Sequence, residues 1–136
     1  MNTTPSPLDA ALARVGDRWS LLVVEALLAG PQRFNDLLAA IPGVATNVLS
    51  HRLKRLESEA VVIARPYSER PPRFSYELTA AGTELAGALR LLASWGGTGA
   101  DAPRHTACGT PLEIRWHCPT CARPVTEPDD EGLDYA

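Results

Sequence analysis

One proline-rich hairpin within an otherwise helical chain limits the folds that this sequence can adopt. Residues 61–67 (VVIARPY) and 73–78 (RFSYEL) are β-branched and aromatic runs with partial alternation, a pattern typical of strands. The intervening residues 68–72 (SERPP) predict a turn, because proline is tolerated where no ladder N–H is needed. A single hairpin among helices indicates a mainly α fold of the α+β class.

Five segments around this hairpin have apolar residues at helical spacing. They are residues 6–16, 17–30, 33–41, 45–59 and 80–95. Ser6, Asp17 and Thr79 are expected to cap the first, second and last of them, and Thr46 is expected to cap the fourth. Residues 42–43 (Pro-Gly) predict a tight turn between the third and fourth helices. This order of elements predicts a winged helix-turn-helix with a two-stranded wing.

Charge is distributed unevenly along the chain, which has 13 basic and 16 acidic side chains. Seven basic and four acidic residues lie between Arg33 and Tyr76, whereas residues 125–136 hold five acids and no base. The net charge of −3 therefore hides a basic middle, and the distribution matters more than the sum for a nucleic-acid partner.

Five polar side chains of segment 45–59 project away from the apolar stripe of Leu49, Leu53 and Leu56. They are Thr46, Asn47, Ser50, His51 and Lys54. Short donors and acceptors together with one long cation suit the major groove, where base edges offer both donors and acceptors. We therefore expect residues 45–59 to be a DNA-recognition helix, although a merely solvated helical face would have a similar composition.

Five arginines flank this face or lie on the hairpin, and a sixth begins the preceding helical segment. We expect them to contact DNA, chiefly its phosphates, which fix register without carrying sequence information. They are Arg33, Arg52, Arg55, Arg65, Arg70 and Arg73. A proline-stiffened loop with arginines suits the DNA backbone or a narrow minor groove, so residues 65–76 are the expected wing. A solvated turn is one alternative, and a winged helix that binds proteins is another.

Four stretches resemble the HxlR-type winged-helix transcriptional regulators, which are relatives of the MarR type. They are residues 17–44 (DRWSLLVVEALLAGPQRFNDLLAAIPGV), 49–57 (LSHRLKRLE), 65–82 (RPYSERPPRFSYELTAAG) and 91–96 (LLASWG). The resemblance covers about residues 8 to 97 and implies a homodimer that binds operator DNA. Many members carry a cysteine just before the first helix, but this chain has residues 3–10 (TTPSPLDA) there, so a thiol sensor at that position is excluded.

The resemblance also implies that the first helix and the helix after Thr79 supply the dimer interface. The expected interface residues are Leu12, Leu85, Leu89, Leu92 and Trp95. Packing within one chain is the alternative for each of them. A twofold dimer would place two recognition helices in successive major grooves, about 34 Å apart.

The sequence changes in character after the helical part, so we expect a domain of residues 1–98 and a small tail of residues 99–136. His105 and Cys108 form one pair separated by two residues, and Cys118 and Cys121 form another. Such pairs can wrap one tetrahedral ion, and a hairpin formed by residues 110–117 (TPLEIRWH) would join them. The tail is therefore expected to bind one zinc ion and to end in an acidic, disordered segment.

Three alternatives for this tail stay open. His117 is a second possible histidine ligand, Cys118 and Cys121 could form a redox-responsive pair, and all of these residues could be unliganded. The tail is too short to build a hydrophobic core without a cross-link such as a metal ion, which favours the metal-binding alternative.

Other classes of protein lack support in the sequence. The three histidines fit no nucleophile–base pattern, and no Gly-rich phosphate loop or paired-carboxylate motif is present, so we do not expect an enzyme. No run of about 18 apolar residues predicts a membrane span. The N-terminus has no secretory pattern, so we expect a cytoplasmic protein.

Overall fold

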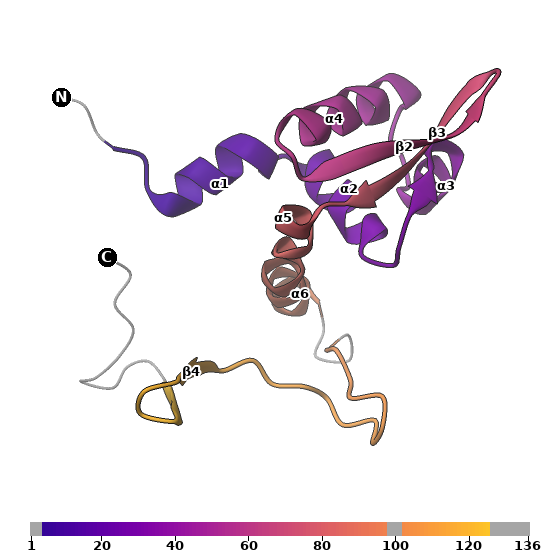
Figure 1. Cartoon of the computed structure of the whole chain (residues 1–136). Helices are drawn as coiled ribbons and strands as arrows, with labels where there is room; N and C mark the ends of the chain where they lie inside the picture. Colours follow the sequence, from indigo (N-terminus) through magenta and orange to yellow (C-terminus); the bar gives the residue numbers. More distant parts are fainter. Residues whose placement is uncertain (1–3, 98–101, 126–136) are drawn as a thin grey trace. The chain divides into compact units, whose positions relative to one another are not determined.

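A computed structural model of the chain describes residues 4–97 and 102–125 (Figure 1). The chain divides into two units, residues 1–90 and residues 91–136, and each is described by itself. The predicted boundary after residue 98 falls beside residues outside the described part and stays a prediction. The predicted acidic end, from Glu127 to Asp134, also lies outside the described residues.

The first two helices begin at the caps that the sequence indicates. Helix α1 (Pro7–Val15) starts where the Ser6 side chain accepts the Asp9 N–H at 3.1 Å, and proline occupies its first turn. Helix α2 (Arg18–Leu27) starts where Asp17 accepts the Ser20 N–H at 2.9 Å. Both N-cap predictions are confirmed.

The next two helices form the helix-turn-helix. Helix α3 (Phe34–Ala40) and helix α4 (Thr46–Ser58) are separated by a short connection in which Gly43 has a φ of +82°. That left-handed conformation favours glycine, which explains the Pro-Gly turn. The prediction that Thr46 caps α4 was wrong, because Ala45 is the extended N-cap and Thr46 is the first helical residue.

Three antiparallel strands form the wing and its base. Strands β2 (Val62–Glu69) and β3 (Pro72–Leu78) pair along their length, so the turn at the tip is shorter than the predicted residues 68–72. Strand β1 (Gln32–Arg33) adds to the other side of β3, giving the order β1-β3-β2. This two-residue strand is too short to show a period, so it cannot be predicted from the sequence.

The core of the first unit lies between α2, α3, α4 and the start of β2. Leu37, Leu49 and Leu56 are fully buried, and Val23 and Val24 from α2 pack in the same cluster. Each such side chain contributes about 1.5–3 kcal/mol by leaving water. This packing fixes which side of α4 faces inward.

The predicted helix over residues 80–95 is two helices. Helix α5 (Ala80–Thr83) follows the cap at Thr79, whose hydroxyl accepts the Gly82 N–H at 3.0 Å, and α6 (Leu85–Gly96) begins after Glu84. None of the described helices has the length and apolar character needed to cross a bilayer.

Within residues 102–125, the second unit has two short turns. Arg104 and Pro111 form an isolated antiparallel bridge around the first turn. Strands β4 (Trp116–Cys118) and β5 (Arg123–Val125) pair around the second. The predicted strand over residues 110–117 is therefore wrong except at its end, since residues 112–115 are not in a strand.

Candidate nucleic-acid interface

The outer face of α4 has the composition that the sequence predicts. Because an α-helix turns about 100° per residue, the five predicted base-contacting positions span only about 140° of its circumference. Thr46, Asn47, His51 and Lys54 are exposed and Ser50 is half-buried, whereas Leu56 on the opposite side is buried. The described part of the chain offers these five side chains no internal hydrogen bond or ion pair. The face is thus available to an external partner.

Arg52 lies apart from this face and pairs with the N-cap of another helix. Its Nε is 3.0 Å from Asp17 Oδ1, and each side chain is 34% exposed. Partial burial acts to raise the pKa of Asp17, but the Ser20 hydrogen bonds and the Arg52 charge outweigh burial and leave that pKa below its ordinary value. Arg52 therefore links α4 to the start of α2.

Two more of the predicted arginines also have internal partners. Arg55 donates to the backbone carbonyl of Ala13 in α1, and Arg65 pairs with Glu77 on the neighbouring strand. A guanidinium has five N–H donors, so these contacts leave others free. Each of these arginines nevertheless makes a contact that stabilises the subunit itself.

A β-bulge joins the wing to the helix-turn-helix. The register of β2 against β3 shifts between Pro66 and Ser68, which leaves Tyr67 as the extra residue. The Arg33 guanidinium lies 4.3 Å from the centroid of the Tyr67 ring. Arg33 is the N-cap of α3, and its N–H donates to Asp36 Oδ2 at 3.0 Å.

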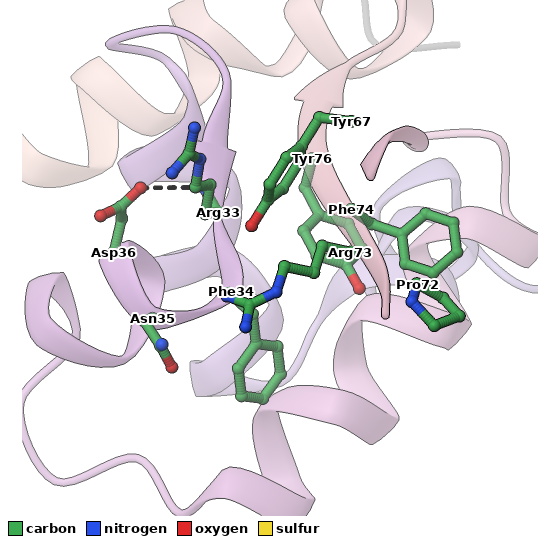
Figure 2. A pocket seen from close by; sticks show the side chains of 9 residues that line it. All are labelled: Arg33, Phe34, Asn35, Asp36, Tyr67, Pro72, Arg73, Phe74 and Tyr76. Carbon is green, nitrogen blue, oxygen red and sulfur yellow. Dashed lines mark hydrogen bonds between the residues drawn. The ribbon is translucent and has the colours of Figure 1, made fainter. Parts of the chain in front are cut away.

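A cavity of about 380 Å³ lies between α3 and the wing (Figure 2). Its lining residues are Arg33, Phe34, Asn35, Asp36, Tyr67, Pro72, Arg73, Phe74 and Tyr76. The Arg73 side chain extends from β3 across this cavity toward Phe34. Aromatic rings and two guanidinium groups therefore surround one concave surface next to the predicted wing.

Two of the predicted arginines at the tip of the hairpin are exposed to solvent. Arg70 occupies the turn and Arg73 lies opposite Ser68, and both are exposed. Within the described ranges 4–97 and 102–125, neither arginine has an acidic partner within ion-pair distance. Tyr67 and Asn35 also line this cavity but carry no signal in the sequence. Tyr67 contacts Arg33, which is far away along the chain.

The predicted dimer residues differ in burial. Leu89 is 8% exposed and belongs to the core cluster, and Leu85 packs partly against that cluster. Leu12, Leu92 and Trp95 are 48%, 52% and 85% exposed. The last three are therefore large apolar side chains that the described chain leaves exposed.

The predicted metal ligands form two separate pairs. His105 Nδ1 and Cys108 Sγ lie 3.3 Å apart, and the Cys121 N–H donates to Cys118 Sγ at 3.5 Å. Over the described residues, no group of three or more potential ligands is close enough to hold a metal ion. His117 lies on β4 opposite Pro124.

The helix-turn-helix, the three-stranded sheet and the free polar face of α4 together define a winged helix-turn-helix protein. The family model for HxlR-like helix-turn-helix proteins matches residues 14–103, and the chain belongs to this family. It is a transcriptional regulator of the HxlR type, within the wider MarR-like group.

Individual relatives agree with this assignment. The HTH-type transcriptional regulator Rv3095 of Mycobacterium tuberculosis is 34% identical over 123 residues, which cover 85% of this chain and 77% of that protein. The crystal structure of the HTH-type transcriptional regulator ytcD superposes with a TM-score of 0.63 at 30% identity, covering 68% of this chain and 94% of that one. The redox regulator HypR in its reduced form gives a TM-score of 0.63 at 27% identity, covering 67% and 90%.

Proposed function

We propose that this regulator binds double-stranded DNA in a sequence-specific manner, with α4 in the major groove. The observation that carries the proposal is the exposed face of Thr46, Asn47, Ser50, His51 and Lys54, whose side chains have no partner within the described chain. An α-helix fits the major groove, and these side chains match the donors and acceptors of base edges.

The wing supplies backbone contacts in this proposal. Arg70 and Arg73 are exposed without an acidic partner among the described residues, and Arg33 lines the same cavity as Arg73. Arginine neutralises phosphate and releases counterions, which makes binding salt-dependent. Arg52, Arg55 and Arg65 have partners within the chain, so we expect them to contribute less to phosphate binding than Arg70 and Arg73.

Two copies of the chain bind one operator in this proposal. Leu12 on α1 and Leu92 and Trp95 on α6 are large exposed apolar side chains, and burial against a second copy would remove them from water. Replacement of Trp95 by Asp should then shift the protein from dimer to monomer in analytical ultracentrifugation. An unchanged sedimentation coefficient for that variant would exclude Trp95 from the interface.

The DNA proposal is tested by titrating labelled duplexes at several salt concentrations. The duplexes come from the region upstream of the protein's own gene and from selection out of a random pool. Arg73→Ala should weaken binding to every duplex and flatten the salt slope by about one unit, as expected for the loss of one phosphate contact. Arg65→Ala is the matched control, because its guanidinium pairs with Glu77.

Equal losses for Arg65→Ala and Arg73→Ala would contradict the assignment of the wing. Failure of the wild-type chain to select any duplex from the pool would contradict the proposal as a whole and would favour a protein-binding winged helix instead.

A further inference from the structure

We propose that His105, Cys108, Cys118 and Cys121 bind one zinc ion per chain, and that this ion joins the two turns of the second unit. The site is independent of the proposed DNA-binding surface. It rests on the local shape of the two turns, on the donor set that they carry and on the exposed apolar row between them.

The first turn presents its two donors at the separation that zinc requires. In a tetrahedral site with Zn–N of about 2.0 Å and Zn–S of about 2.3 Å, the two ligand atoms lie about 3.5 Å apart. His105 Nδ1 and Cys108 Sγ are 3.3 Å apart. The Gly109 N–H donates to the His105 carbonyl at 2.7 Å and closes the turn, with a φ of +70° at Gly109.

The second turn has the same arrangement as the first, with two ligands three positions apart and a backbone hydrogen bond between residues four positions apart. Cys118 and Cys121 take the places of His105 and Cys108, and the Ala122 N–H donates to the Cys118 carbonyl at 2.8 Å. Ala122 follows with a φ of +55°. In addition, the Cys121 N–H points at Cys118 Sγ at 3.5 Å, as a backbone donor does toward a thiolate ligand.

The left-handed conformation at Ala122 is informative because alanine disfavours it. The cost is roughly 1–2 kcal/mol relative to glycine, which occupies the matching position in the first turn. The described residues of this unit form no buried core, so they offer little other reason to hold this strain. Strained residues concentrate at functional sites.

The donor set and spacing select the metal. One imidazole and three thiolates, in two pairs each separated by two residues, are a common structural zinc set. Each turn offers only two donors, so a four-coordinate ion needs both. Nine residues separate Cys108 from Cys118, and a chain of that length can return on itself.

The segment between the turns carries an uncovered apolar row. Leu112, Ile114 and Trp116 alternate along it and are 50%, 53% and 60% exposed. Joining the two turns would fold this segment back and give the row a surface to pack against. Metal binding and folding of this unit would then be a single linked step.

The test measures zinc on the full-length protein purified under reducing conditions from zinc-supplemented cells. We expect one zinc ion per chain by mass spectrometry of the metal. Cys108→Ser, Cys118→Ser, Cys121→Ser and His105→Ala should each lose most of it. His117→Ala is the matched control and should retain it, because His117 lies on β4 outside the two ligand pairs.

Trypsin provides a second measurement on the same protein. Arg115 is exposed between the turns, so zinc should slow cleavage there and chelation should restore it, while cleavage after the exposed Arg73 in the wing should not change. Absence of zinc from the wild type would overturn the proposal. Retention of zinc by His105→Ala and Cys108→Ser would overturn the four-ligand site, and an unchanged rate at Arg115 would overturn the joining of the turns.

Discussion

The guanidinium of Arg33 lies 4.3 Å from the centre of the Tyr67 ring, and this contact connects the start of α3 with the bulge of the wing. Arg33 also belongs to β1, which pairs with β3 at Ser75. The wing is thus held to the helix-turn-helix by a strand pair and by a cation–π contact. In the proposed complex, this anchoring would fix the distance between α4 in the major groove and the wing on the neighbouring DNA backbone.

Loss of the Tyr67 ring should weaken DNA binding without changing base preference. An exposed cation–π contact contributes about 0.5–1 kcal/mol, so Tyr67→Ala should lower affinity a few-fold for all duplexes. Tyr67→Phe keeps the ring and should bind within about twofold of the wild type. Fluorescence anisotropy on a selected duplex and on a scrambled one measures both effects. A loss confined to the selected duplex would mean that Tyr67 contacts bases instead.

The pair of Asp17 and Arg52 should make stability depend on pH in the acid range. The folded pKa of Asp17 is depressed, so its contribution is present above the unfolded value of about 3.9 and is lost as pH falls through the folded value. Asp17→Asn keeps a capping oxygen but removes the charge. Because both side chains are 34% exposed, solvent weakens the pair, and the expected loss at pH 7 is about 0.5–1 kcal/mol.

Urea unfolding at pH 7 and at pH 3 measures this difference. The difference in the free energy of unfolding between the wild type and Asp17→Asn should be smaller at pH 3 than at pH 7. Asp17→Ala also removes the cap and should lose about 1 kcal/mol more at pH 7. A gap that is constant with pH would show that the charge of Asp17 is unimportant for stability.

The sequence was sufficient for the features that depend on neighbouring residues. Helical periodicity, the caps at Ser6, Asp17 and Thr79 and the hairpin are local patterns, and the structure has each of them. The cap at Thr46 failed because the Pro-Gly turn leaves Ala45, not Thr46, as the extended residue before α4.

Contacts between distant residues could not be derived in this way. In the sequence, Arg52 and Arg65 cannot be distinguished from Arg70 and Arg73 as possible phosphate contacts. In the structure, however, Arg52 pairs with Asp17 and Arg65 pairs with Glu77. Only the packing of α4 on α2 and the pairing of β2 with β3 bring those partners together. Charge along the sequence therefore overestimates the number of arginines that are free for phosphate.

Asn47 is the position where we expect a change in base preference. An asparagine in the major groove can form two hydrogen bonds with adenine, and each such pair contributes about 1–3 kcal/mol of discrimination. Asn47→Ala should therefore lose preference at a single base pair of a selected duplex while its salt slope stays the same. Binding to duplexes that differ at one position each measures this. An equal loss on all of them would assign Asn47 to the backbone.

Gly82 and Gly87 provide a matched pair for testing how closely α5 packs on the backbone of Val61, the residue before β2. A Cβ on Gly82 would lie 2.2 Å from the Val61 carbonyl oxygen, which is backbone and cannot rotate away, whereas a Cβ on Gly87 in α6 would meet nothing within 4 Å. Gly82→Ala should therefore lower the free energy of unfolding by about 1–3 kcal/mol or more. Gly87→Ala should raise it by up to about 1 kcal/mol, because alanine is the better helix former. Thermal and urea unfolding of the two variants measure the difference directly.

Similar stabilities for both variants would mean that α5 can move away from Val61. The Thr79 hydroxyl donates to the Ala60 carbonyl at 2.6 Å, and this hydrogen bond would then not fix the position of α5.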